Sequence, residues 1–450
     1  MREEQKHLLA CTAAGAAAGL AAFHLYRQYA LACAGPSARD TTAEATPTKP
    51  SPSSDRKATA ASSAKAAVPP KSVEGAATVA IVGTGWGIKV QTPNFKQCGI
   101  RLGAVYSRDP QRASELAKQH GFERGYSDVK ELCENGKVDV VSVVTPVSFH
   151  CDQAIEALAA GKHVLCDKPM ALNAAEAEKM MAASRAHPMQ VAIMDHELRF
   201  TPMLQVPRAH LQKGTIGVVK YVEVLATMPD AFAGGWTWWV DREAGGGAWG
   251  ALGSHLIDAL RFLFDGEVES ISAHMRSLTK TLKDKETKKD KPVTADDYAS
   301  IQIRLVPSNA KTLNEKIWGP GQHQSAEVHI TLAMVGQAAP TSTMLVTGSK
   351  GSITVDVNSS SSKVLDAKQK VVAEVKGEGN AFGTTGTRLL GEALQKAFGP
   401  EKDRSALDAA AQFEDGLAVQ YVLDAGWESS DQGGAKVTPK VAATNWAAVV

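Results

Sequence analysis

The sequence predicts an α/β fold in which an N-terminal Rossmann domain with a doubly wound parallel sheet precedes a C-terminal α+β domain with an open, mainly antiparallel sheet. Between Thr78 and Ile193, short β-branched runs alternate with longer Ala-, Leu- and Glu-rich stretches of helical length. This alternation is typical of βα units around a parallel sheet. After about Asp195, strand-like runs follow one another with few helices between them, as expected for an antiparallel sheet.

The positions of the expected elements follow from these runs. Rossmann strands are expected at Val79–Val82, Leu102–Tyr106, Val138–Val144, His163–Cys166 and Val191–Ile193. The main helices between them are expected at Gln111–Gln119, Ser148–Ala160 and Ala174–Ala186. Strands of the second domain are expected at Val219–Ala226, Val268–His274, Ala299–Leu305, Ala326–Met334, Ser342–Val346 and Ser352–Val357.

Composition divides the chain into five parts. We expect residues 1–34 to be a membrane anchor or targeting segment. Residues 35–75 are expected to form a disordered linker, because this polar stretch cannot bury enough apolar surface to offset its ordering entropy. Residues 76–195 would form the Rossmann NAD(P)-binding domain, residues 196–430 the substrate-binding and oligomerisation domain, and residues 431–450 a C-terminal tail.

The first 34 residues contain an uncharged apolar run, Leu8–Phe23, that is shorter than the roughly 20 residues of a spanning helix. Three interpretations stay open. A secretory signal cleaved near residues 32–34 is disfavoured by Arg27, and an organelle transit peptide is disfavoured by Glu3 and Glu4. We therefore favour a signal anchor that associates with a membrane through residues 8–23.

Charge and cysteine content limit the classes of partner. A net charge of +1 over 450 residues creates no field that would attract nucleic acid, so we expect a small-molecule substrate and no nucleic-acid partner. The cysteines show neither C-x-x-C nor metal-ligand spacing, which favours buried thiols in a reducing compartment such as the cytoplasm, and no metal site. The six cysteines are Cys11, Cys33, Cys98, Cys133, Cys151 and Cys166.

A glycine-rich loop follows the first expected strand. In the run 83–88, Gly83 permits a tight turn and Gly85 lets the backbone approach a pyrophosphate at the following helix N-terminus. Ile88 stands where the third glycine of G-x-G-x-x-G is usual, and Gly87 beside it is expected to compensate in part. Such a loop can be a simple turn, but after the first strand of a βαβ series it predicts cofactor binding. The expected cofactor-binding residues here are Gly83, Thr84, Gly85, Trp86 and Gly87.

The end of the second strand bears on the choice between NAD and NADP. An acidic residue about 20 positions after the glycine loop would bind the ribose 2′-hydroxyl of NAD. Here the strand ends in Ser107 and Arg108, with no carboxylate before Asp109. A guanidinium suits a 2′-phosphate, so we predict NADP, with NAD as the alternative. Arg108 could instead be a solvated residue at a strand end.

Two further blocks resemble a known family. Residues 166–169, Cys-Asp-Lys-Pro, and residues 144–150, Val-Thr-Pro-Val-Ser-Phe-His, are similar to motifs of the glucose-fructose oxidoreductase and inositol dehydrogenase (Gfo/Idh/MocA) family. The family hallmark is Glu-Lys-Pro where this chain has Asp-Lys-Pro. The resemblance covers about residues 78 to 430 and implies a homo-dimer or tetramer. It places further residues near the cofactor: Thr145, Pro146, His150, Asp167 and Lys168.

A third family block spans residues 245–258. Relatives commonly carry an aspartate where this chain has Ala251, followed four residues later by the histidine matched by His255. A spacing of i and i+4 puts the two side chains on one helix face, where both can meet a substrate. Loss of the carboxylate argues against polyol specificity of the inositol dehydrogenase kind. Hydride transfer itself does not require it.

Lys168 and His255 are the expected catalytic residues. Hydride transfer needs a group that donates or accepts a proton at the substrate oxygen. Lys168 follows a parallel strand at its carboxyl end, where open α/β sheets bind ligands, and His255 titrates near neutral pH. In the alternative interpretations, Lys168 is solvent-facing and His255 is a core residue. Asp258 could orient the imidazole of His255.

Substrate contacts are expected from three further residues. Trp238 and Trp239 could stack on a sugar ring or line an apolar pocket, but closely spaced tryptophans can equally form core. Arg199 follows the last Rossmann strand in the run His196, Glu197, Leu198. It could bind substrate or form an ion pair between the domains, and the second interpretation is favoured.

The sequence therefore predicts an NAD(P)-dependent oxidoreductase that moves hydride between the nicotinamide, with NADP favoured, and a hydroxyl or carbonyl group. The expected substrate is a sugar, polyol, cyclitol or related small molecule. Two alternatives stay open: a non-catalytic NADP-binding regulator or scaffold, suggested by Ala251 and the anchor-like N-terminus, and an NAD-dependent glycosidase of the same fold.

Overall fold

The computed structural model describes residues 75–134, 137–228, 234–308, 314–320, 324–336, 340–377 and 381–440. The expected anchor at residues 8–23, nearly all of the linker and half of the C-terminal tail, residues 441–450, lie outside these ranges. Within them, no helix combines the length and hydrophobicity that crossing a membrane requires.

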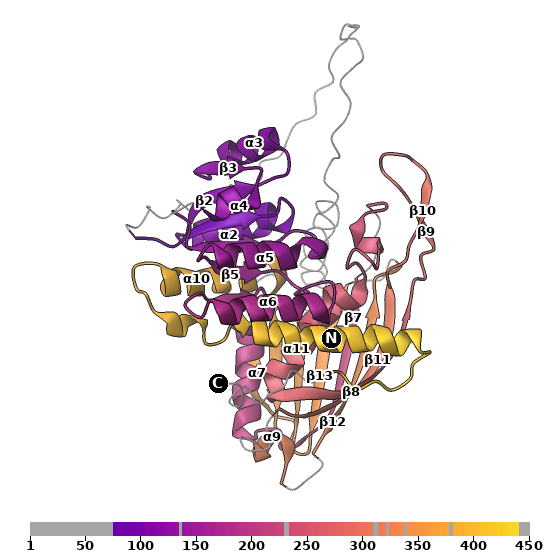
Figure 1. Ribbon diagram of the computed structural model, residues 1–450. Coiled ribbons are helices and arrows are strands. Elements are labelled where there is room, and N and C mark those ends of the chain that lie inside the picture. Colours follow the sequence, from indigo (N-terminus) through magenta and orange to yellow (C-terminus); the bar gives the residue numbers. More distant parts are fainter. Residues whose placement is uncertain are drawn as a thin grey trace, which may run out of the picture.

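A seven-stranded sheet forms the centre of the N-terminal domain (Figure 1). Its strands lie in the order β17-β6-β5-β4-β1-β2-β3, and all pair in parallel except the edge pair β17–β6. The strands span β1 Thr78–Val82, β2 Arg101–Tyr106, β3 Arg124–Tyr126, β4 Val140–Val143, β5 His163–Cys166, β6 Ala192–Met194 and β17 Ala411–Gln412. The order reverses at β1, which confirms the predicted doubly wound Rossmann sheet.

Helices cover both faces of this sheet. The first begins as a π-helical turn, Gly87–Gln91, and continues as α2. Asp109 is the N-cap of α3. Its Oδ1 accepts hydrogen bonds from the backbone N–H groups of Gln111 and Arg112, at 2.9 and 3.3 Å. The helices span α2 Thr92–Gln97, α3 Pro110–His120, α4 Val129–Cys133, α5 His150–Ala159 and α6 Ala174–Ala186.

The second domain is built on an eight-stranded sheet in the order β16-β15-β14-β13-β7-β12-β11-β8. Neighbouring strands pair antiparallel except β12 and β7, which pair in parallel, so the expected mainly antiparallel sheet is confirmed. The strands span β7 Val219–Thr227, β8 Gly266–Arg276, β11 Tyr298–Pro307, β12 Ala326–Ala333, β13 Thr341–Gly348, β14 Ser352–Asp356, β15 Ser361–Leu365 and β16 Val371–Val375. A separate hairpin joins β9 Thr281–Lys283 to β10 Asp290–Pro292.

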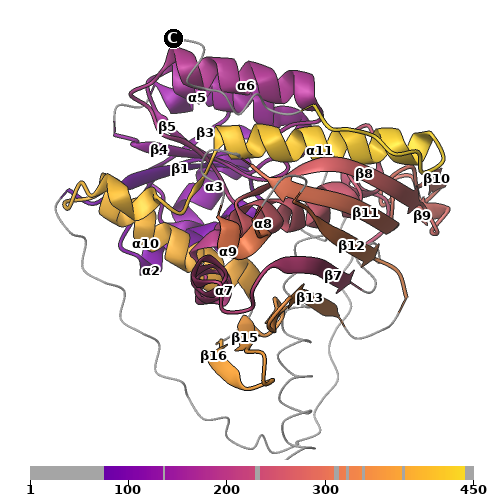
Figure 2. The ribbon, with the colours of Figure 1, turned by 90° about the horizontal axis from the view of Figure 1, so that it is seen from below.

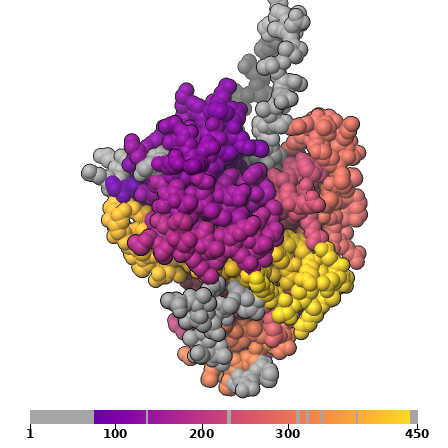
Figure 3. Space-filling model, in the orientation of Figure 1, coloured from indigo at the N-terminus to yellow at the C-terminus, as the bar shows by residue number. Residues whose placement is uncertain are grey.

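After β16 the chain returns to the Rossmann domain. The 19-residue helix α11 runs beside α6 and then beside β8, so it spans both domains (Figures 1 and 2). Leu390 and Phe398 of α10 pack into the core on one face of the Rossmann sheet, and Phe413 of α11 packs into the core on the other. The remaining helices span α7 Pro202–Lys213, α8 Ser254–Phe264, α9 Glu315–Trp318, α10 Gly386–Phe398 and α11 Phe413–Asp431. In the space-filling view, α11 occupies the junction of the two lobes (Figure 3).

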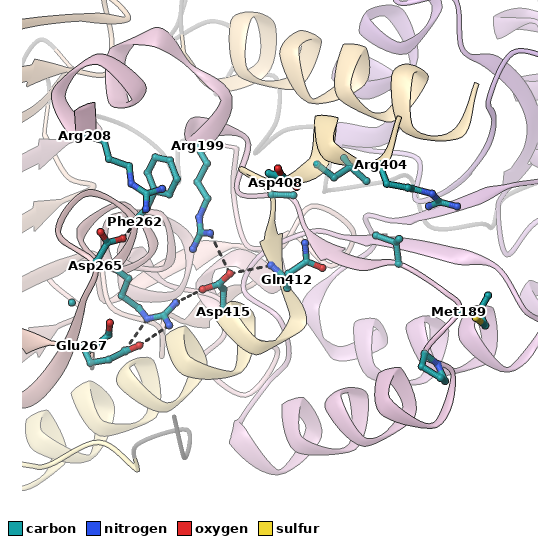
Figure 4. A pocket seen from close by; sticks show the side chains of 17 residues that line it. Met189, Arg199, Arg208, Phe262, Asp265, Glu267, Arg404, Asp408, Gln412 and Asp415 are labelled. Atoms are coloured by element: carbon teal, nitrogen blue, oxygen red, sulfur yellow. Dashed lines mark hydrogen bonds and ion pairs between the residues drawn. The ribbon is translucent and has the colours of Figure 1, made fainter. Parts of the chain in front are cut away.

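Ion pairs join the elements that meet at this junction (Figure 4). Asp415 at the start of α11 accepts from Arg199 at 3.2 Å and from Arg261 at 2.7 Å. Arg199 also contacts Asp258 through its Nε and Nη2 atoms, at 2.7–3.1 Å, and Arg261 contacts Glu267 at 2.7 Å. Two guanidinium groups thus share one carboxylate, which holds α11 against α8 and the turn that follows β6.

Replacing Asp415 tests this junction. Burial opposes ionisation, yet the charges of Arg199 and Arg261 hold the pKa of Asp415 well below its usual range. The variant Asp415→Asn should therefore lower the free energy of unfolding by about 2 kcal/mol at neutral pH, because two buried guanidinium groups lose one partner. The difference should persist at mildly acidic pH and vanish only as the pH falls through the low folded-state pKa. Urea unfolding at several pH values measures it.

The matched control is Asp431→Asn, since Asp431 pairs with Arg242 at an exposed position. It should change the free energy of unfolding by less than about 1 kcal/mol. Equal losses in the two variants would contradict the assignment of a junction role to Asp415.

Candidate active site

The glycine-rich loop lies between β1 and its helix, close to the end of β4. Gly83 has φ +144°, and a Cβ atom there would lie 2.2 Å from the carbonyl oxygen of Val144. A Cβ atom on Gly87 would lie 2.5 Å from Ile81 Cγ2 and 2.7 Å from Val144 Cγ1. Gly87 therefore permits the close helix–strand packing that a third glycine usually serves, and the expected compensation is confirmed. Ile88 is buried in the Rossmann core.

The loop after β4 is tied to the loop after β5 by one histidine. His150 Nε2 lies 2.8 Å from the carbonyl oxygen of Thr145, and its Nδ1 lies 3.1 Å from that of Pro169. Thr145 Oγ1 also donates to Gln153 at 2.7 Å. His150 is 1% exposed and both its ring nitrogens contact backbone carbonyl oxygens, so it fixes the two loops relative to each other. Pro146, which follows Thr145 in the loop after β4, is half-buried.

At the end of β2, the guanidinium of Arg108 is exposed and Ser107 is half-buried. Asp109, the first carboxylate after the strand, is the N-cap of α3 and accepts two backbone hydrogen bonds there. A carboxylate engaged in this way is less available to a ribose hydroxyl. Arg108 and Asp109 are thus both exposed at the end of the strand, and Asp109 Oδ1 is engaged by the backbone of α3.

Residues of both domains line a small cavity at the carboxyl ends of β5 and β6. Lys168 follows β5 and is half-buried, and its Nζ donates to the carbonyl oxygen of Ala251 at 3.0 Å. Trp86 of the glycine loop lies in the same wall, so the cavity adjoins the expected cofactor position. The lining residues are Trp86, Asp167, Lys168, Asp195, Glu197, Met228, Ala251, Leu252, His255 and Phe382.

Ala251 lies in a second π-helical turn, Trp249–Gly253, that precedes α8. A Cβ atom on Gly253 would lie 2.2 Å from the ring of Trp249, so glycine is needed where this turn packs on the tryptophan. The indole Nε1 of Trp249 donates to the carbonyl oxygen of Leu423 in α11 at 3.0 Å. Such π turns frequently occur at functional sites. Here the turn presents the backbone oxygen of Ala251 to Lys168.

Below Lys168, a hydrogen-bonded chain holds a buried carboxylate. Asp195 Oδ2 accepts from Gln91 Nε2 at 2.8 Å, and Ser142 Oγ donates to Gln91 Oε1 at 2.7 Å. Asp195 Oδ1 has no hydrogen-bond partner among the described residues. Burial and the nearby charge of Asp167 raise the pKa of Asp195 to about 7, against the opposing effects of Gln91 and Lys168. A buried, incompletely bonded carboxyl is suited to a polar ligand.

Glu197 and His255 form the second polar pair of the cavity. Glu197 Oε2 lies 3.9 Å from His255 Nδ1, and each side chain is 5% exposed. Burial, followed by the charge of Asp195, raises the pKa of Glu197 well above its usual value. Burial, followed by the charges of Lys168 and His196, lowers the pKa of His255 well below its usual value. Both groups are therefore expected to be neutral at neutral pH.

Three expected residues do not line this cavity. Arg199 is engaged by carboxylates at the domain junction, which corresponds to the favoured ion-pair interpretation. Trp239 is buried in the core of the second domain, and the half-buried Trp238 packs beside it with ring centroids 5.4 Å apart. The carboxylate of Asp258 is bound by Arg199, so Glu197, and not Asp258, is the acidic neighbour of His255.

Several residues in or beside the cavity were not among the site residues expected from the sequence. Glu197 is one of them, although its position after the carboxyl end of a Rossmann strand could have identified it as a site residue. Phe382 and Gln91 reach the site through tertiary packing alone. Within the described part of the chain, no group of three or more His, Cys, Asp or Glu side chains is arranged to hold a metal ion.

Comparison with known proteins gives two matching family models. Residues 77–194 match a model described as an oxidoreductase family with an NAD-binding Rossmann fold, and residues 205–354 match the GFO/IDH/MocA C-terminal domain. Together the two models cover more than half of the chain.

The individual relatives share between 21% and 36% sequence identity with this chain. An uncharacterized oxidoreductase of Synechocystis is 36% identical over 237 residues, which is 51% of this chain and 62% of that protein. Glucose-fructose oxidoreductase domain-containing protein 2 of Xenopus laevis is 24% identical and aligns with 79% of this chain and 92% of its own length. A levoglucosan dehydrogenase in complex with NADH and L-sorbose has a TM-score of 0.69 at 21% identity, over 81% of this chain and 99% of that one. This likeness establishes the shared fold.

The packing of the glycine loop can be tested by substitution. The variant Gly87→Ala places a methyl group against Ile81 and Val144, so it should cost about 1–3 kcal/mol of stability and weaken dinucleotide binding. The control Ile88→Val, at the position of the usual third glycine, should cost about 1 kcal/mol and leave binding intact. Urea unfolding and quenching of tryptophan fluorescence by NADPH measure both effects. Weaker binding in Ile88→Val than in Gly87→Ala would contradict the assignment.

Proposed function

Because the chain belongs to the Gfo/Idh/MocA family of NAD-binding oxidoreductases, we propose that it is an NADP-dependent dehydrogenase or reductase of a sugar, polyol, cyclitol or related small molecule. One observation carries the proposal. Lys168 and His255, from different domains, line a single cavity that also receives Trp86 from the glycine loop. This shared lining supports proton transfer beside the position expected for the nicotinamide.

The residues of the cavity have distinct tasks in this proposal. The bound dinucleotide would supply or accept the hydride. Lys168 would polarise the substrate oxygen with its ammonium group, which Ala251 orients through its carbonyl oxygen. His255 would give or take the proton at that oxygen. Gly83 and Gly87 pack closely against Val144, which lets the loop make the tight turn that a dinucleotide-binding loop requires.

The lining supports a small polyhydroxylated substrate. Lys168, Asp195, Glu197 and His255 supply polar atoms, and the apolar lining, which includes Phe382, can cover the carbon skeleton. One of the polar groups, Asp195, has a buried oxygen, Oδ1, without a hydrogen-bond partner among the described residues. A substrate hydroxyl group would satisfy this atom. The similarly folded levoglucosan dehydrogenase binds L-sorbose, which agrees with this class.

The preference for NADP over NAD is supported by the end of β2. Arg108 is exposed there, and Asp109 is engaged as a helix N-cap. The guanidinium can form charge-assisted hydrogen bonds with a 2′-phosphate, and the adjacent carboxylate of Asp109 is partly engaged by the backbone of α3.

The homo-dimer or tetramer implied by the family resemblance stays a prediction. It is supported by apolar side chains on the face of the eight-stranded sheet that points away from its helices. Tyr221, Leu225 and Leu345, on the adjacent strands β7 and β13, are 38–42% exposed. Contiguous exposed apolar residues are typical of interaction surfaces.

Removing the ammonium group of Lys168 tests the catalytic proposal. The variant Lys168→Ala should lower kcat at least about 10²-fold, because the substrate oxygen loses its polarising group, while NADPH binding is retained. Turnover is followed by nicotinamide absorbance with a panel of sugars, polyols and their carbonyl derivatives. Near-normal turnover in Lys168→Ala would refute the role of this lysine. Binding of NADPH without turnover of any compound by the native chain would favour the non-catalytic scaffold.

Removing the guanidinium of Arg108 tests the cofactor assignment. The variant Arg108→Ala should weaken NADP binding by about 1.5–3 kcal/mol, roughly ten- to hundredfold in Kd, and leave NAD binding unchanged. Arg101→Ala is the matched control, since Arg101 is an exposed arginine at the opposite end of the same strand. Calorimetric titration measures both affinities. An unchanged ratio of NADP to NAD affinity in Arg108→Ala would show that the assignment is wrong.

A further inference from the structure

Glu197 and His255 face each other from different structural elements. Glu197 belongs to a short 3-10 turn, Glu197–Phe200, that follows β6, and His255 lies in the first turn of α8. The Oε2 and Nδ1 atoms are 3.9 Å apart, and Nδ1 has no hydrogen-bond partner among the described residues. Both side chains line the cavity. A shift of less than about 1 Å would join them by a hydrogen bond, and such tightening is common when a substrate binds.

The surroundings of Glu197 favour its neutral form. The charged and titratable groups that face it are Asp195 at the end of β6, Asp167 and Lys168 after β5, and His255 on α8. The preceding residue, His196, is buried beside them. From the C-terminal segment, Gly386 packs against the Cγ atom of Glu197 and Phe382 covers the cavity, and neither carries charge. With Asp195 close by and only one ammonium group present, a second ionised carboxylate here is unfavourable.

We propose that Glu197 stores the proton that the site delivers through His255 to the oxygen of a carbonyl substrate, so that the site is arranged for reduction. This inference rests on the proposed hydride-transfer function and adds a direction and a proton source to it. The family resemblance implies that relatives commonly carry an aspartate where this chain has Ala251. Glu197 would place a carboxyl beside the histidine from another element.

Hydride, electrons and protons are all accounted for in the proposed reduction of the carbonyl group. The carbonyl carbon receives the hydride and its electron pair from the reduced dinucleotide, and the electrons of the C=O π bond move to oxygen. That oxygen takes a proton from one ring nitrogen of His255. The Nδ1 atom of His255 takes the proton of Glu197, so the imidazole ends neutral and Glu197 ends ionised. The products are the alcohol and the oxidised dinucleotide.

The protonation of Glu197 can be measured without any substrate. Carbon-13 NMR of the full chain labelled at glutamate carboxyl carbons, titrated with pH, should show one resonance that ionises well above the others and that disappears in Glu197→Gln. The exposed Glu401 provides the reference resonance, which is assigned by its loss in Glu401→Gln. If Glu197 titrates together with Glu401, the proposal is overturned.

A second measurement uses the variant Asp195→Asn. Removing the like charge of Asp195 should lower the pKa of Glu197, and the resonance should then ionise at lower pH than in the native chain. An unchanged or higher titration midpoint would contradict the assigned electrostatic cause.

Kinetics separate the stored proton from a structural role. With NADPH and a carbonyl panel that includes L-sorbose, D-fructose and D-glucose, kcat/KM for reduction should fall as the pH rises through the raised pKa of Glu197. In Glu197→Gln the rate at neutral pH should drop about 10–100-fold and this pH limb should disappear, with NADPH affinity unchanged. Persistence of the limb would overturn the proposal. Failure of the native chain to oxidise NADPH with any carbonyl would contradict the proposed function itself, even where Glu197 titrates as predicted.

Discussion

The candidate active site depends on one contact across the domain junction, in which the ammonium of Lys168 donates to the backbone oxygen of Ala251. A lysine at the end of a Rossmann strand points toward solvent unless another element covers it. Here the π turn at the start of α8 covers it, and Trp249 anchors that turn to α11. The helix α11 in turn is held by Asp415 between two arginines. The position of the ammonium group therefore depends on packing that involves both domains.

The electrostatics of the cavity follow from placing three carboxyl groups around one ammonium group. Water would keep all of them ionised, but burial penalises each charge, and one lysine cannot neutralise three carboxylates. The result is a raised pKa at Asp195 and Glu197 and a lowered one at His255. Opposed shifts of this kind are characteristic of sites that exchange protons near neutral pH. The same neutral groups retain unpaired polar atoms, which a hydroxylated ligand can satisfy.

Much of this arrangement could be predicted from the sequence. The remaining features could not, because they depend on contacts between residues that are distant in sequence. Periodicity located the two sheets, and the glycine loop and the Asp-Lys-Pro motif located the cofactor side, because these features are local. The strand β17 has only two residues, pairs antiparallel with β6 and directly precedes α11, so no periodic pattern in the sequence marks it. The proposed role of Glu197 depends on burial and on neighbours distant in sequence. Asp258 was expected to orient His255, but its carboxylate is bound by Arg199, and Glu197 lies beside His255 instead. The tryptophans Trp238 and Trp239 illustrate an ambiguity that only three-dimensional packing resolves.

The central claim is that hydride transfer takes place in the cavity where the Rossmann loop meets the second domain. A crystal structure of the full chain with NADPH tests it most directly. The account predicts density for the nicotinamide ring in the cavity that Trp86, Lys168 and His255 line, with the adenosine end of the cofactor near Arg108. A nicotinamide ring bound away from Lys168, with this cavity closed by side chains, would contradict the account.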